Sequence, residues 1–155
     1  MQELDRYDKR ILTLLQSDGR MSNQDLADAI GLSPSPCLRR VKALEEAGLI
    51  TGYRALVDAK KLGYSLMALI YISMDQHTPE RFASFESGIA AIPEVLECLL
   101  ITGQQADYQL KVIVADMDGY QNLLLNKITR IKGVTGVHTS FVLRRVVDKT
   151  EVPVD

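Results

Sequence analysis

The sequence predicts an α+β protein of two domains, because two kinds of hydrophobic pattern follow one another along the chain. In the first third, apolar residues recur at helical spacing in three short segments. Further on, short runs rich in β-favouring residues alternate with helical segments. A chain of 155 residues, of which 46% are hydrophobic and 25% are charged, has room for two small domains. We therefore expect a helical domain over residues 1–55, a hinge over 56–64 and a mixed domain over 65–155.

The first two predicted helices are both amphipathic, and a serine is placed to cap the second. The apolar face of the first helix is formed by Leu4, Tyr7, Ile11, Leu14 and Leu15. Ser22 is suited to cap the second helix, because its hydroxyl can accept a hydrogen bond from a backbone N–H of the first turn. The buried side of this second helix would consist of Leu26, Ala27 and Ile30. Gly31 then permits a sharp turn into a third helix.

The third helix is predicted to begin at Ser33 and Pro34, since serine is a common N-cap and proline fits the first helical position. Its buried stripe would consist of Cys37, Leu38, Val41 and Leu44. Its opposite face would carry Ser35, Arg39, Lys42 and Glu46. Gly48 is placed to end the helix, and the segment from Leu49 to Tyr53 is predicted to be extended, which would add a small wing.

Two helices joined by a tight turn, the second with an exposed basic face, are typical of a helix-turn-helix, which places a helix in the major groove of DNA. Arginine can donate two hydrogen bonds to guanine, and lysine mainly neutralises phosphate. The candidate DNA-binding residues are Asn23, Ser33, Ser35, Pro36, Arg39, Arg40 and Lys42. The alternative is that these side chains only solvate a surface helix. The combination of cap, proline, turn glycine and basic face, in this order, favours double-stranded DNA as a partner.

Charge and composition exclude several classes of protein. A net charge of −2 argues against a protein that coats nucleic acid over its whole surface, so the basic character is local. No apolar run is long enough to cross a membrane, and acidic residues stand where a secretory signal would be basic, which predicts a cytoplasmic protein. Cys37 and Cys98 give neither a disulfide framework nor a metal-ligand spacing, and His77 and His138 are far from any second ligand. We expect no metal site, no catalytic residues and no enzyme activity.

The mixed domain is predicted to have the order βαββαβ, which is the ferredoxin-like arrangement. Strands are expected over residues 65–74, 95–101, 108–114 and within 134–147. Helices are expected after the caps Thr78 and Asp116. Such a layer covers one sheet face with two helices and leaves the other face open. Met67, Leu69 and Tyr71 make that open face apolar, which predicts self-association into at least a dimer.

Specific motifs in both halves resemble the Lrp/AsnC family, the feast/famine regulators of bacteria and archaea. In the first half, the resemblance rests on LDRYDKRILTLLQSDGR, on SPSPCLRRVKALEEAGLI and on the following Gly52-Tyr53. The second half is similar to the family's ligand-sensing domain, called RAM, at Pro93-Glu94-Val95, Thr102-Gly103, Asp107-Tyr108 and Gly133-Val134. The resemblance implies a transcriptional regulator at the nucleoid of a bacterial or archaeal cytoplasm. It also implies a dimer, commonly assembled into an octamer of four dimers, that responds to a small amino acid bound between sensing domains.

The resemblance further implies where that effector binds. In the family the effector lies near the loop after the second strand. The matching positions are Thr102, Gly103, Gln104, Gln105, Asp107 and Tyr108, with Thr139 on the last strand. Loop N–H groups can bind a carboxylate, and the aspartate can bind an α-ammonium group. Gly103 and Asp107 are four residues apart where many members have three, and the alternative role of Asp107 is to shape a β-hairpin turn.

Two other functions are open at this point. The second half could be a ferredoxin-like amino-acid-binding module or a small enzyme with a helical appendage, and such a protein would have no salt-dependent affinity for DNA. Alternatively, the chain could be an architectural DNA-binding protein whose affinity for DNA responds to no amino acid. No cofactor is implied by any of these functions beyond the amino-acid effector.

Overall fold

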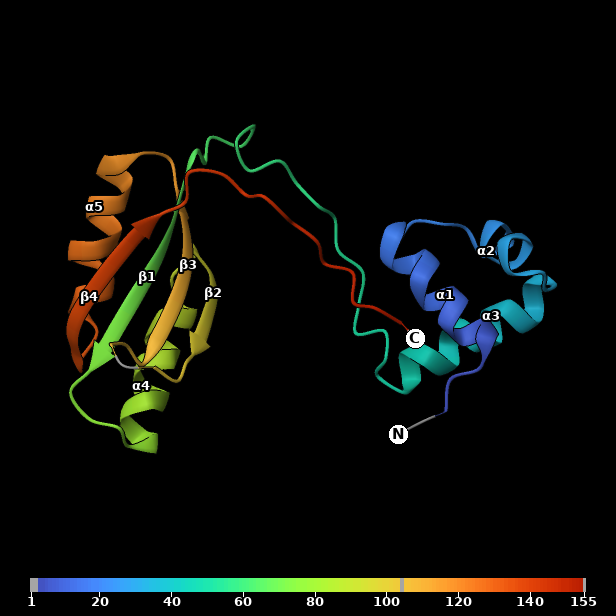
Figure 1. The fold of residues 1–155 in the computed structure, drawn as a ribbon, viewed down its shortest axis with the longest axis horizontal. Coiled ribbons are helices and arrows are strands. Elements are labelled where there is room, and N and C mark those ends of the chain that lie inside the picture. Colours follow the sequence, from blue (N-terminus) through green and yellow to red (C-terminus); the bar gives the residue numbers. More distant parts are fainter. Residues whose placement is uncertain (1–2, 104, 155) are drawn as a thin grey trace. The chain divides into compact units, whose positions relative to one another are not determined.

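The computed structural model describes residues 3–103 and 105–154. These residues form two compact units (Figure 1). The first unit contains the chain up to Leu56 and the residues from Val147 onward, and the second spans Val57–Val146. The division differs from the expected boundaries in two places. Almost all of the expected hinge belongs to the second unit, and the end of the chain belongs to the helical unit instead of the mixed one.

Three helices build the first unit: α1 Arg6–Ser17, α2 Asn23–Ile30 and α3 Pro34–Glu46. Ser22 caps α2 as predicted, since its hydroxyl accepts a hydrogen bond from the Asp25 N–H at 3.1 Å. Ser33 precedes α3 as predicted, but its side chain makes no capping hydrogen bond. Gly31, with a φ of 74°, adopts the left-handed conformation that the turn between α2 and α3 requires.

The core of the helical unit is small. Its buried residues are Ile11, Leu26, Ala27, Cys37 and Leu44. Leu38, predicted in the buried stripe of α3, is 43% exposed. Around a helix Leu38 lies only about 60° from Ser35, which is exposed, and about 100° from Cys37. The buried stripe of α3 is narrower than predicted, so the prediction that Leu38 is buried is wrong.

The predicted wing has no strand in the structure. Between Glu46 and Leu66 the described chain contains only turns and coil. Gly48 follows the end of α3 as predicted, with a φ of 70°. Tyr53 reaches back to α3, where its hydroxyl donates to Glu45 at 2.9 Å. The wing prediction is wrong because a β ladder needs a partner strand, and the described residues of this unit provide none.

The end of the chain pairs with α1. The side-chain amide of Gln16 donates to the Val152 carbonyl oxygen at 3.0 Å and accepts from the Val152 N–H at 2.8 Å. One amide therefore satisfies both backbone groups of Val152. This contact gives a physical reason why the residues from Val147 onward belong to the helical unit.

The second unit has the predicted βαββαβ order. Its elements are β1 Leu66–Met74, α4 Pro79–Ala90, β2 Val95–Leu100, β3 Tyr108–Val114, α5 Met117–Asn126, the short 3₁₀ turn η1 Ile128–Arg130 and β4 Val134–Phe141. The four strands pair antiparallel in the order β2-β3-β1-β4. Thr78 and Asp116 cap the two helices as predicted. The predicted fold class, a helix-turn-helix domain followed by a ferredoxin-like domain, is confirmed apart from the wing.

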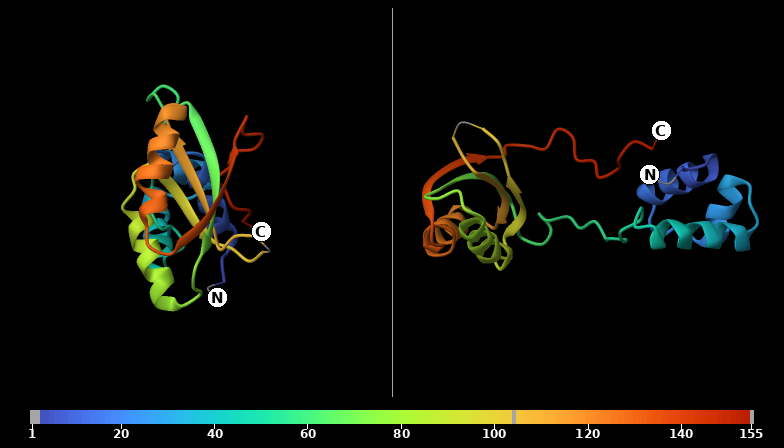
Figure 2. Two further views of the ribbon diagram at one scale, coloured as in Figure 1. Left: turned by 90° about the vertical axis from the view of Figure 1, so that its left-hand side faces the viewer. Right: turned by 90° about the horizontal axis from the view of Figure 1, so that it is seen from below.

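Helices α4 and α5 cover one face of the sheet, as the right-hand view of Figure 2 shows. Alternate residues of β1 are buried in this layer: Ala68, Ile70, Ile72 and Met74. In the same layer, the ring of Phe85 on α4 packs against that of Tyr108 on β3, with centroids 4.6 Å apart. The intervening residues Met67, Leu69 and Tyr71 lie on the opposite face, where they are half-buried.

Ion pairs centred on Arg40 join α1 to α3. The Arg40 Nη1 lies 2.9 Å from an Asp5 carboxylate oxygen and 2.8 Å from an Asp8 carboxylate oxygen. The guanidinium also lies over the Tyr7 ring, 5.2 Å from its centroid. The backbone N–H of Asp8 lowers the pKa of Asp5, and the Tyr7 N–H and Arg40 act in the same direction. Arg40, predicted to face DNA, thus holds α3 against the start of α1.

Arg40→Ala should loosen the helical unit, because it leaves two carboxylates without their cation and removes the ring contact. We expect backbone amides of α1 and α3 to exchange about fivefold faster in the full-length variant. Hydrogen–deuterium exchange measured peptide by peptide checks this. Arg39→Ala removes the same charge from the neighbouring position and should leave exchange unchanged. Equal exchange in the two variants would contradict the structural role of Arg40.

The effect of Arg40→Ala should also depend on pH. Because the pKa of Asp5 is lowered in the folded chain, the stabilisation that its carboxylate gains from the Asp8 and Tyr7 N–H groups and from Arg40 is fully present above the ordinary value of 3.8. It is lost as the pH falls through the lowered pKa, where the folded chain also protonates this carboxyl. The exchange rates of the wild type and the variant should therefore converge in acid. If the difference in exchange rate between the wild type and the variant stayed the same at low pH, an ionic contribution of Arg40 to stability would be ruled out.

Candidate DNA-binding and effector sites

The exposed face of α3 carries a short row of polar side chains. Ser35, Arg39 and Lys42 are all exposed, and Ser33 is exposed at the N-cap. Within the part of the chain that the structure describes, neither Arg39 nor Lys42 forms an ion pair. The backbone N–H groups at the start of α3 add partial positive charge. This face can therefore offer hydrogen-bond donors and positive charge to an anionic partner.

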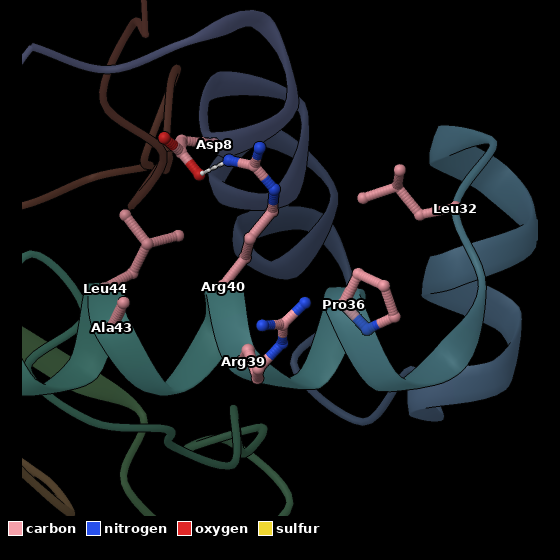
Figure 3. A pocket seen from close by; sticks show the side chains of 7 residues that line it. All are labelled: Asp8, Leu32, Pro36, Arg39, Arg40, Ala43 and Leu44. Atoms are coloured by element: carbon pink, nitrogen blue, oxygen red, sulfur yellow. Dashed lines mark hydrogen bonds and ion pairs between the residues drawn. The ribbon is translucent and has the colours of Figure 1, made fainter.

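Arg40 and Asn23 do not belong to this exposed face. Figure 3 shows Arg40 reaching from α3 to Asp8, with Arg39 apart from that ion pair. The Asn23 Nδ2 donates to the Pro34 carbonyl oxygen at 2.8 Å, so this side chain joins the start of α2 to the first turn of α3. Its Oδ1 is buried and has no hydrogen-bond partner among the described residues. Both residues have contacts that position α3 within the helix-turn-helix.

A depression of about 430 Å³ lies beside α3 on the side that faces α1. It is lined by Asp8, Leu32, Pro36, Arg39, Arg40, Ala43 and Leu44 (Figure 3). Pro36 is half-buried there, at the edge of the exposed face.

Leu38, expected in the core, belongs to the exposed face instead. The small helical angle between Leu38 and Ser35 is the sequence signal that could have placed it there.

The predicted effector loop connects β2 to β3. The Ile101 N–H donates to the Asp107 carbonyl oxygen at 2.9 Å and closes the hairpin. The exposed residues of the loop are Thr102, Gly103 and Gln105. Gln104, which was predicted to be part of the site, lies outside the described residues. The described part of the loop therefore presents polar groups that a small ligand could contact.

The Asp107 carboxylate anchors the segment that follows β1. Its Oδ2 accepts a hydrogen bond from the Met74 N–H at 2.7 Å, and its Oδ1 lies 2.7 Å from the His77 Nε2. The Asp107 side chain is 21% exposed, whereas that of His77 is 66% exposed. The hairpin itself is closed by the Asp107 backbone carbonyl, whereas the Asp107 side chain joins the loop to the segment after β1. Of its two partners, the exposed imidazole is the one that a ligand could replace.

Tyr108 and Thr139 lie on the helix-covered face of the sheet. Tyr108 is 1% exposed, and its hydroxyl donates to the Glu86 Oε1 of α4 at 2.7 Å. Burial raises the pKa of Tyr108, and the Glu86 carboxylate adds to the shift. The Thr139 Oγ1 lies 2.6 Å from the Tyr120 hydroxyl of α5. Both predicted effector residues therefore contribute to helix packing and are not part of the exposed loop.

Other features of the described chain bear on its chemistry. No helix in residues 3–103 and 105–154 has the length and apolar character needed to cross a bilayer. The same residues contain no group of three His, Cys, Asp or Glu side chains arranged to hold a metal ion.

A pocket of about 500 Å³ lies at the opposite end of β3 from Asp107, lined in part by Leu62, Leu96 and Ile113.

Family models match both units. Residues 67–152 match the Lrp/AsnC ligand binding domain, and residues 4–51 match a winged helix-turn-helix DNA-binding domain. The chain is 42% identical over 153 residues to the Bkd operon transcriptional regulator of Pseudomonas aeruginosa, with 99% of each chain covered. It is 41% identical over 144 residues to the leucine-responsive regulatory protein of Escherichia coli K12, with 93% of this chain and 87% of the relative covered.

Solved structures show the same similarity. A transcriptional regulator from Neisseria meningitidis, solved as a complex with L-methionine, aligns with a TM-score of 0.92 and 36% identity, and 97% of each chain is covered. Escherichia coli AsnC aligns with a TM-score of 0.88 and 30% identity, covering 98% of this chain and 100% of that one. The helix-turn-helix, the ferredoxin-like unit and these matches agree, and the chain belongs to the Lrp/AsnC family of transcriptional regulators.

Proposed function

We propose that this regulator finds its operator through the exposed face of α3, which enters the major groove of double-stranded DNA. The observation that carries the proposal is the separation of two neighbouring arginines. Arg40 is held to α1, whereas Arg39 is exposed beside Ser35 and Lys42. An exposed row of hydroxyl, guanidinium and ammonium groups matches the acceptor-rich edges and phosphates of a groove.

The residues of this face have different roles in the proposal. Arg39 donates two hydrogen bonds to a guanine, and Lys42 neutralises a phosphate. Ser33 and Ser35 lie at the N-terminal end of α3, where hydroxyls and backbone N–H groups together can bind a phosphate or a base edge. The side chains that join α3 to α1 and α2 act by fixing its orientation and need not touch DNA.

We further propose that the effector is an amino acid bound at the loop between Thr102 and Asp107. The support is the match to a ligand binding domain and the L-methionine complex of the Neisseria meningitidis neighbour. Loop N–H groups bind the effector's carboxylate, and its ammonium group replaces His77 at the Asp107 Oδ1. The Asp107 Oδ2 keeps its hydrogen bond to Met74, so the hairpin remains in place.

The open face of the sheet is the surface that we propose for dimer formation. Leu69 lies in the second strand from one edge, opposite Lys111 of β3 and Ser140 of β4. A second copy would bury this side chain together with Met67 and Tyr71. Four such dimers would form an octamer, as the family resemblance implies.

Regulation follows if the effector binds one assembly better than another. Only a difference in affinity between two states can shift their populations. A shift between assemblies would change how many α3 helices can contact DNA together. The action of the protein would take place at the nucleoid, where its operators lie.

Arg39→Ala and Lys42→Ala should each weaken binding to DNA from upstream of the protein's own gene. Lys42→Ala loses a phosphate contact, so its slope of log K against log salt should fall by about one, whereas Arg39→Ala loses a guanine contact, which should cost ~1–3 kcal/mol of binding free energy. Fluorescence anisotropy at several salt concentrations measures both quantities. Lys132→Ala, an exposed cation of the second unit, is the matched control and should bind like the wild type. An affinity for DNA that changes neither with salt nor in Arg39→Ala and Lys42→Ala would favour an amino-acid-binding module instead.

One free amino acid, the effector, should stabilise the wild type against thermal unfolding. At a concentration of 100 Kd it should raise the free energy of unfolding by ~2.7 kcal/mol. Asp107→Asn should weaken its binding about tenfold to hundredfold, because a charge-assisted hydrogen bond is lost. His77→Ala should bind as tightly or more tightly, since it frees the Asp107 Oδ1. Thermal shift and calorimetry with each amino acid in turn measure these effects. No response to any amino acid would favour an architectural DNA-binding protein.

Leu69→Glu should weaken self-association at least tenfold, because it places a charge in the middle of the proposed dimer face. Sedimentation velocity over a range of protein concentrations measures the association constant. Leu125→Glu changes a leucine of α5 that is 48% exposed, and it should associate like the wild type. The open face would be excluded as the interface if Leu69→Glu left the dimer intact.

A further inference from the structure

Leu38 is an apolar side chain on the polar face of α3. It is 43% exposed, and its neighbours on that face, Ser35, Arg39 and Lys42, are exposed as well. In the described part of the unit, the apolar core and the side chains packed against it do not include Leu38. Single exposed leucines are common on protein surfaces, so exposure by itself indicates nothing. The position of Leu38 among the proposed DNA-binding residues is the informative feature.

The helical spacing ties Leu38 to the same partner as its neighbours. Ser35 lies three residues before it and Lys42 four residues after it, so the three side chains form one continuous row. A surface that touches both Ser35 and Lys42 must also lie against the leucine between them. If that surface is the major groove, the isobutyl group meets base edges.

The major groove offers one apolar group to such a side chain, which is the C5-methyl group of thymine. We propose that Leu38 reads a thymine in each half-site by packing against this methyl group. The inference rests on the proposed entry of α3 into the groove and adds a residue that selects sequence without a hydrogen bond. Removing one methyl group from such a contact should weaken binding about fourfold.

The apolar character of the leucine also predicts that it disfavours cytosine at this position. Cytosine presents an amino group at the neighbouring position and lacks the methyl group. Leu38 would leave that donor without a partner while excluding water from it, which disfavours cytosine beyond the loss of the methyl contact. The donors of this face can distinguish the thymine O4 acceptor from the cytosine amino group, but they do not sense the methyl group, which only an apolar contact such as Leu38 can bind.

The experiment replaces thymines by deoxyuridine, which keeps every hydrogen-bonding group and lacks only the methyl. A duplex selected by the full-length wild type from a randomised pool is prepared with one replacement at a time. We expect the wild type to lose about fourfold in affinity at one thymine of each half-site. Leu38→Ala should bind the original duplex more weakly and show no further loss at that thymine. Leu49→Ala removes a leucine that is 45% exposed just beyond α3, and it should keep the wild-type pattern.

Two results would overturn the role of Leu38 alone. One is a wild type that is indifferent to replacement at every thymine, and the other is a Leu38→Ala variant that retains the loss at the same thymine. In both, Arg39→Ala would still weaken binding in a salt-dependent way. If instead Arg39→Ala and the wild type bound DNA equally at all salt concentrations, the proposed use of α3 would fail together with the inference about Leu38.

Discussion

The small apolar core of the helical unit is the constraint on which its arrangement depends. Among the described residues, five buried side chains from three helices form this core, and a unit of this size buries a smaller share of its surface than a large domain does. Directional polar contacts therefore have to orient the helices. Asn23 joins the start of α2 to α3, and Arg40 joins α3 to α1. These contacts lie away from Arg39 and Lys42, so the remaining face of α3 is available for DNA.

The second unit links its proposed ligand loop to its fold in a similar way. The Asp107 carboxylate binds the Met74 N–H at the end of β1 and the His77 ring just before α4. A ligand that takes the place of the imidazole would therefore act on the connection between β1 and α4. On the helix-covered face, Tyr108 joins the sheet to α4 and Thr139 joins it to α5. Replacement of the imidazole would thus alter a surface segment and leave these buried contacts in place.

Features that depend on a few neighbouring residues were predictable from the sequence. The cap at Ser22, the turn at Gly31 and the alternation along β1 are local, and the structure confirms them. The wing and the burial of Leu38 were not predictable, because one depends on a partner strand and the other on the width of a core built from three helices. The Asp107 contacts join residues 30 or more positions apart, which no spacing in the sequence indicates.

The sequence by itself determined the order of elements, the two-domain α+β class and the concentration of basic residues on α3. Only the tertiary structure decided which arginine pairs with carboxylates of α1 and which stays exposed. Arg39 and Arg40 are adjacent and chemically identical, and either could pair with DNA or with protein. Consecutive helical residues point about 100° apart, so the packing of α1 brings Asp5 and Asp8 to Arg40 and leaves Arg39 exposed. The reason is that a side chain's role depends on which charges the fold places within its reach.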